Sequence, residues 1–140
     1  MIQGVLGITS KKKEIAVLRK LIKDVIGFSK YEQSAEITIT LQSSATVAHT
    51  LGIKPILVKT MAVCKTAEYG YAVGDELDLS TNANDGTPGA NSETGFSVAV
   101  TATNFKYVIG DDIPVLNYAT PAAQTSLTPS NWRLVVRLWG

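Results

Sequence analysis

The chain has 140 residues, enough for one domain with a hydrophobic core of its own. Hydrophobic residues make up 45% and charged residues only 18%, which is typical of a globular chain and suggests that partners cover some of its surface. No apolar stretch approaches the roughly 20 residues needed to span a bilayer. The apolar start, residues 1–8, lacks the charged leader and the length of a signal peptide. We therefore expect synthesis and assembly in a cytoplasm.

The first 30 residues are strongly basic. They hold seven basic and two acidic side chains, giving +5, so residues 31–140 carry −4 in a chain of net charge +1. A basic arm on a mildly acidic body indicates an anchor for an acidic surface, while a solvated helix face explains the same charges. The charged residues that we assign to partner binding are Lys11, Lys12, Lys13, Arg19, Lys20 and Lys23.

The same segment has the spacing of an amphipathic helix. Ser10 is a plausible N-cap, and Gly27 offers a stop. The apolar stripe between them must pack either on the chain's own body or on a neighbouring subunit. Its partner-binding residues are Ile15, Leu18, Ile22 and Val25.

After Tyr31 the apolar period changes from helical to alternating, which predicts an arm over residues 1–30 and a β-domain over 31–140. The expected fold is mainly β: an antiparallel, jelly-roll-like β-sandwich preceded by one N-terminal amphipathic α-helix. The expected strands cover residues 36–41, 45–49, 56–65, 76–80, 96–103, 105–109, 113–118 and 132–139.

Two further segments stand out. Residues 81–92 are almost purely turn-forming and polar, so we expect an exposed loop. The last strand carries apolar residues on both faces, which is usual for a strand that is central in its sheet or covered by another chain.

Residues that could support catalysis or metal binding occur in unfavourable surroundings. His49 is the only histidine, and it runs into a turn punctuated by Gly52 and Pro55, where an imidazole can bond to the backbone. Cys64, the only cysteine, lies in an apolar run and reads as a core residue. The acidic residues Asp75, Glu76, Asp78, Asp111 and Asp112 fit turns and a solvated rim better than a calcium site. We expect no enzyme activity, no catalytic residue, no metal and no cofactor.

Two binding functions remain open at this stage. The arm could contact nucleic acid, but no aromatic residue for stacking precedes Phe28, so docking on an acidic protein surface explains the charge at least as well. A carbohydrate-binding or hydrolytic sandwich is the more remote alternative, with Trp132 and Asp75 as the residues to test.

One stretch resembles a pattern in small structural proteins of tailed bacteriophages. It reads His49-Thr50-Leu51-Gly52-x-x-Pro55, then a strand ending in Cys64, then Ala67-Glu68-Tyr69-Gly70-Tyr71-Ala72-Val73-Gly74-Asp75-Glu76. The match covers about 30 residues, and the ending at residues 132–137 fits more loosely. This sequence departs from the pattern at Thr50, where a glycine is usual. Within this pattern we expect His49, Gly52, Pro55, Gly70, Tyr71, Gly74 and Asp75 to be structural turn residues.

The resemblance implies a trimeric β-sandwich attached to a larger shell or tube. The first expectation is a capsid decoration (cement) protein, a homotrimer on the virion surface whose partner is the major capsid protein or another virion protein. The alternative is a tail-fibre or collar subunit, with the loop at 81–92 facing a receptor. Neither reading involves a membrane, and nucleic acid is not the expected partner.

Overall fold

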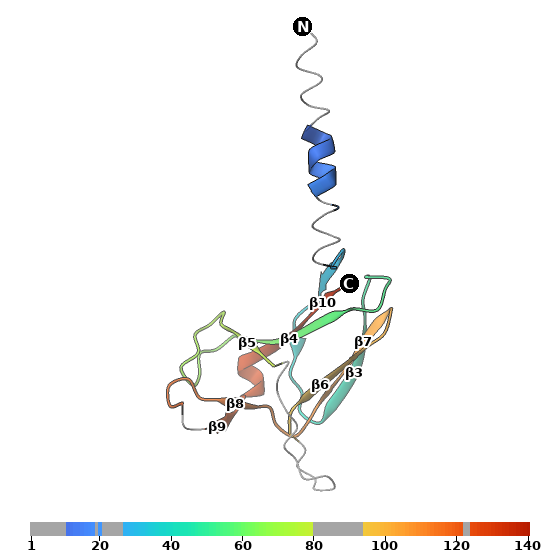
Figure 1. Ribbon diagram of the computed structural model, residues 1–140. Coiled ribbons are helices and arrows are strands. Elements are labelled where there is room, and N and C mark those ends of the chain that lie inside the picture. The colour runs from blue at the N-terminus through green and yellow to red at the C-terminus, as the bar shows by residue number, and fades with distance from the viewer. Residues whose placement is uncertain (1–10, 19, 21–26, 80–93, 122–123) are drawn as a thin grey trace.

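The computed structural model describes residues 11–18, 20, 27–79, 94–121 and 124–140. Residues 11–18 and 20 are helical, and the strands begin at Tyr31 (Figure 1). The chain is therefore mainly β, with antiparallel strands preceded by one helix, as the change of period near Tyr31 predicts. Ser10 and the loop predicted at 81–92 lie outside the described residues.

The first sheet is organised around β10 (Trp132–Trp139), whose bounds match the predicted strand. β10 pairs antiparallel with β4 (Leu57–Cys64) along its whole length, and β4 pairs in turn with β5 (Glu76–Asp78). The other side of β10 pairs with β1 (Tyr31–Gln33) and then with β2 (Ile37–Thr38). β10 is thus central in its sheet, which is one of the two situations expected for a strand with apolar residues on both faces.

A β-bulge separates β1 from β2. Gln33 is opposite Arg137 and Ile37 is opposite Leu134, so four steps along one strand match three along β10. Ser34 lies at the interruption, where its backbone N–H donates to Val136 O and its hydroxyl accepts from Val136 N. One extra residue at an edge bends the strand. The predicted strand at 36–41 is shorter in the structure, where β2 covers only Ile37 and Thr38.

The second sheet has the order β3 (Ser43–Ala48), β7 (Asn104–Ile109), β6 (Phe96–Val100), again antiparallel. A separate hairpin joins β8 (Pro114–Leu116) to β9 (Gln124–Ser126), and the 3-10 helix η1 (Pro129–Asn131) leads into β10. β1 and β9 were not among the predicted strands. Both are short and polar, so an alternating apolar pattern cannot reveal them.

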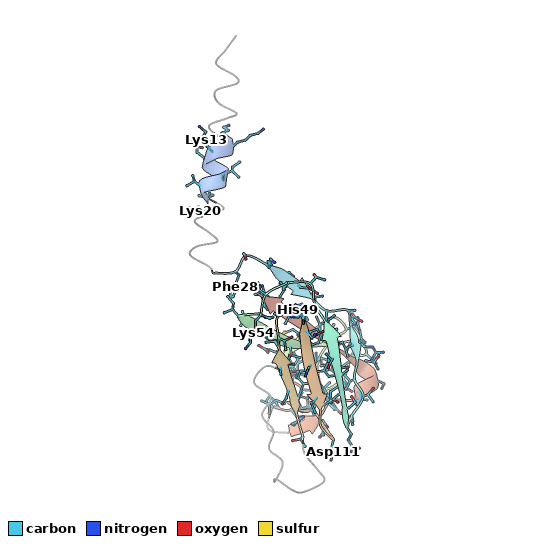
Figure 2. The ribbon with its side chains drawn as sticks, turned by 90° about the vertical axis from the view of Figure 1, so that its right-hand side faces the viewer. Lys13, Lys20, Phe28, His49, Lys54 and Asp111 are labelled. Carbon is cyan, nitrogen blue, oxygen red and sulfur yellow. The ribbon has the colours of Figure 1, made fainter. Side chains whose placement is uncertain are left out.

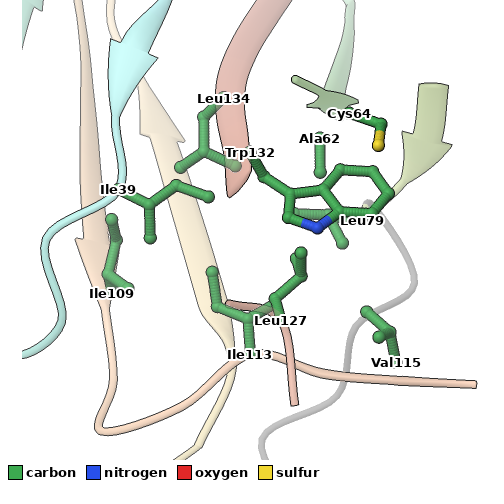
Figure 3. Packing of buried hydrophobic residues seen from close by; sticks show 10 residues of the cluster. All are labelled: Ile39, Ala62, Cys64, Leu79, Ile109, Ile113, Val115, Leu127, Trp132 and Leu134. Atoms are coloured by element: carbon green, nitrogen blue, oxygen red, sulfur yellow. The ribbon is translucent and has the colours of Figure 1, made fainter. Parts of the chain in front are cut away.

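The two sheets enclose a core with two parts. The larger part surrounds Trp132 and draws residues from both sheets and from the β8–β9 hairpin (Figure 3). The smaller part lies around Phe105 and Leu138, and Ile37 and Tyr107 pack against both parts. Each fully buried large side chain contributes about 1.5–3 kcal/mol relative to exposure, so this core dominates the stability of the body.

Candidate assembly interface

The described part of the arm helix lies wholly in solvent. Every described residue from 11 to 20 is exposed, including Ile15 at 52% and Leu18 at 60%. Figure 2 shows Lys13 and Lys20 on a helix that stands clear of the sandwich. Among the described residues, neither part of the sandwich core includes a helix side chain, so the stripe does not pack on its own sandwich there. Arg19, Ile22, Lys23 and Val25 lie outside the described residues.

The described arm residues combine positive charge with exposed apolar surface. Lys11, Lys12, Lys13 and Lys20 are countered only by Glu14 within this part of the helix. The ion pairs between described residues instead lie on the body: Lys59–Asp78, Lys65–Glu36 and Arg137–Glu76. An isolated helix of this length is marginal in water, and one with exposed Ile and Leu side chains gains stability when another surface covers them.

The arm joins the body through hydrogen bonds made by two residues at its end. The backbone N–H groups of Ser29 and Lys30 both donate to Gly140 O at 2.7 Å, and the Lys30 ammonium donates to Leu51 O. Gly27 has a φ of +72°, a left-handed conformation that favours glycine. Residues 29 and 30 therefore make their contacts with the sandwich, although the predicted boundary assigns them to the arm.

The His49 turn lies at the end of the sandwich that faces the arm (Figure 2). His49 is 6% exposed, and its Nε2 lies 3.1 Å from Thr101 O, while no described residue is a partner for Nδ1. Gly52 has a φ of +69°, and Pro55 is buried. These contacts tie the turn to the β6–β7 connection.

Thr50, the departure from the phage-like pattern, has a partner of its own. Its hydroxyl and its backbone N–H both donate to Glu32 Oε2 at 2.7 Å. The hydroxyl bond is the main cause of a lowered pKa for the Glu32 carboxyl, and it outweighs the opposing effect of burial. Thr50 thus fastens the turn to β1, next to the base of the arm.

The segment from Glu68 to Asp75 forms a second tight turn at the other end of β4. Gly70 has a φ of +86°, and a Cβ there would lie 2.8 Å from the backbone nitrogen of Ala119. The hydroxyl of Tyr71 donates to Leu116 O, and its ring meets Trp132 edge-on at 5.6 Å. Asp75 Oδ2 accepts from Ala72 N at 2.8 Å, and Gly74 has a φ of +95°. The turn therefore packs the β8 segment against β10.

Glu68 is the residue that sequence reasoning missed. Its carboxylate accepts from Thr128 N at 3.0 Å, from Asn131 Nδ2 at 2.8 Å and from the indole N–H of Trp132. Burial alone would raise its pKa, but these hydrogen bonds, Asn131 first, lower the pKa of the Glu68 carboxyl. One feature of the sequence could have pointed to such a residue. A tryptophan at the start of an apolar strand is expected to be buried, and its indole N–H then needs a hydrogen-bond acceptor.

The residues considered for catalysis are separated and locally satisfied. Cys64 is fully buried opposite Trp132, where burial raises the pKa of its thiol, while His49 lies at the arm end of the body. The acidic side chains bond to separate neighbours: Glu76 to Arg137, Asp78 to Lys59, Asp111 to Gln42 and Asp112 to Ser126. Within the described ranges, no group of three or more His, Cys, Asp or Glu could hold a metal ion.

Comparison of the chain with family models, with curated proteins and with solved structures found no match. None of the helical residues that the structure describes belongs to a helix long and apolar enough to cross a membrane.

Proposed function

We propose that the chain is a virion structural protein, a decoration protein that binds the assembled head of a tailed phage through its arm and stabilises it. The observation that carries this proposal is the arm helix, whose described residues expose Ile15 and Leu18 beside four lysines. The described side chains of this helix are not part of the sandwich core, and they provide an apolar and basic surface for a partner.

The turn motif supports the phage assignment. Its glycines are required by the backbone: Gly52, Gly70 and Gly74 all have positive φ, and a Cβ at Gly70 would also meet Ala119. The residues shared with the phage pattern therefore build the sandwich itself. They argue for the same kind of module, and the exposed arm argues for a role in assembly.

The mechanism is thermodynamic. Contacts made only with the assembled shell stabilise that shell by mass action, because they are lost when it comes apart. In a homotrimer three linked arms raise the effective concentration of one another, so weak single contacts give tight attachment. The partner surface is the major capsid protein or another virion protein, and the lysines require it to be acidic.

The carbohydrate alternative has less support, because one of its two candidate residues is buried and the other is bonded within its own turn. Trp132 is fully buried, so its ring is not available to stack on a sugar, and the Asp75 carboxylate is bonded to the backbone of its own turn. The tail-fibre or collar alternative differs from the first choice in location and copy number, not in chemistry. Imaging can separate the two.

The test is to locate the chain on particles. Phage particles from cells that produce the chain are purified and labelled with gold-conjugated antibody against the body, with particles lacking the gene as the control. The proposal expects many gold particles over the head. A few copies at the tail would replace the head assignment with the tail-fibre or collar one, and unlabelled particles would overturn the virion proposal altogether.

A further inference from the structure

The end of the sandwich from which the arm emerges carries a cluster of exposed apolar side chains. Eleven large hydrophobic residues are exposed within the described ranges, and four of them lie at this end: Tyr31, Ile53, Ile56 and Leu57. Three more belong to the arm helix, so exposed apolar surface is concentrated where the arm and the body meet. Single exposed hydrophobic residues are ordinary, whereas a cluster of them marks a contact surface.

The register of the first sheet brings most of these side chains together. Tyr31, Trp139 and Leu57 lie opposite one another on β1, β10 and β4, so their side chains share one face of the sheet. The rings of Tyr31 and Trp139 have centroids 5.1 Å apart. The backbone N–H of Ile56 donates to Trp139 O, which places Ile56 at the end of this row.

Ile53 connects the row to the base of the arm. A Cβ at Gly140 would lie 2.8 Å from Cδ1 of Ile53, so the Ile53 side chain lies against the residue that follows Trp139. Gly140 is also the residue to which Ser29 and Lys30 are bonded. The apolar surface is therefore continuous with the base of the arm. We call its part on the sandwich, residues 31, 53, 56, 57 and 139, the arm-end patch.

The charges at the two ends of the body differ in sign. Lys30 and Lys54 are exposed at the arm end, and neither takes part in the ion pairs between described residues. The carboxylate of Glu32 at the same end is bonded to Thr50. Asp111 lies at the opposite end of the body (Figure 2). An acidic surface therefore attracts the arm end and repels the far end.

We propose that the arm-end patch lies against the same acidic surface of the assembled shell that the arm binds. This inference rests on the proposed function, and it extends the binding surface from the arm onto the sandwich. The occupant is a protein surface that is acidic and presents apolar side chains to the patch. Because Ser29 and Lys30 join the arm to this end, a bound arm holds the patch beside the shell at high effective concentration. A contact too weak to hold the chain alone then adds to its attachment.

The test compares two aspartate variants of the full chain in co-sedimentation with assembled heads. Ile56→Asp places a charge in the patch at a side chain that is 71% exposed. The matched control is Val73→Asp, because Val73 is also β-branched, is 66% exposed and lies outside the strands, in the turn at the other end of β4.

We expect Ile56→Asp to raise the dissociation constant for heads at least about tenfold, because the contact loses a buried isoleucine and gains a charge that the acidic shell repels. Val73→Asp should leave the dissociation constant unchanged. Far-UV circular dichroism of each variant checks that the β-body remains folded.

Three results would overturn the inference. Equal binding by the natural chain and Ile56→Asp would leave the arm as the whole binding surface, with head binding intact. An equal loss of binding in Val73→Asp would show that the effect is not specific to the patch. A natural chain that stays in the supernatant would overturn head binding itself, and the inference with it.

Sedimentation equilibrium without heads distinguishes the shell from a second copy of the chain as the occupant. The proposal expects the natural chain and Ile56→Asp to have the same molar mass, because the patch does not hold copies together. A lower molar mass for Ile56→Asp would assign the patch to a contact between copies and would contradict the proposal.

Discussion

Trp132, fully buried where β10 begins, donates its indole N–H to the carboxylate of Glu68, which lies 64 positions earlier in the chain. The same carboxylate accepts from Thr128 and Asn131, so a single side chain holds the turn after β4 against the segment that enters β10. This contact joins the middle of the phage-like motif to the central strand of the first sheet.

The first prediction concerns this carboxylate. Glu68→Ala removes three hydrogen bonds and leaves a buried indole N–H without an acceptor, so we expect the free energy of unfolding to fall by about 3 kcal/mol. Urea denaturation followed by tryptophan fluorescence measures it. Glu36→Ala, which breaks only the surface pair with Lys65, should cost about 0.5 kcal/mol. Similar losses in the two variants would mean that Glu68 is not a structural anchor.

The second prediction is the dependence of stability on pH. The pKa of Glu68 lies below its ordinary value of 4.5 in the folded chain, so folding favours the charged form. Its contribution is complete above about pH 5 and is lost as the pH falls through the folded pKa. Glu32 acts in the same direction. Urea midpoints measured from pH 7 to pH 3 should fall less steeply in Glu68→Gln than in the natural chain, and parallel curves would contradict this.

The third prediction compares two glycines of one turn. Both have positive φ, but a Cβ at Gly70 meets the backbone of Ala119 at 2.8 Å, whereas a Cβ at Gly74 meets nothing within 4 Å. Gly74→Ala should cost about 1 kcal/mol for its backbone conformation alone, and Gly70→Ala about 3 kcal/mol because the chain must also move. Thermal unfolding of the two variants measures the difference. Equal costs would show that the contact with Ala119 relaxes freely.

The central strand was predictable because its pattern is local. Trp132, Leu134, Val136 and Leu138 alternate toward the core, and that alternation gave the bounds of β10. The edge strand of the first sheet, β1, could not be predicted in the same way. It is short and polar, and only its pairing with β10 defines it. Glu68 was missed for a related reason: its partners lie at least 60 positions away, and no local pattern links them.

The fourth prediction concerns the charge of the arm. Reversal of Lys11, Lys12 and Lys13 to Glu should weaken attachment to particles, and the loss should be larger at about 0.02 M salt than at about 0.3 M, because exposed charge pairs are screened. Co-sedimentation with particles at the two salt concentrations measures the loss. As a control, Lys106→Glu changes an exposed lysine on the body and should leave attachment unchanged. A loss of attachment that does not depend on salt would show that the apolar stripe, not the charge, holds the chain on the particle.

The most direct test of the central claim is co-sedimentation of assembled heads with the chain shortened by its arm. The cut belongs after Phe28, because Ser29 and Lys30 bond to Gly140 and a cut after Lys30 would also damage the body. We predict that the chain lacking residues 1–28 keeps its β circular dichroism and cooperative unfolding but stays in the supernatant, while the full chain pellets with the heads. Undiminished binding by the shortened chain would show that the sandwich is the anchor, and would contradict the account.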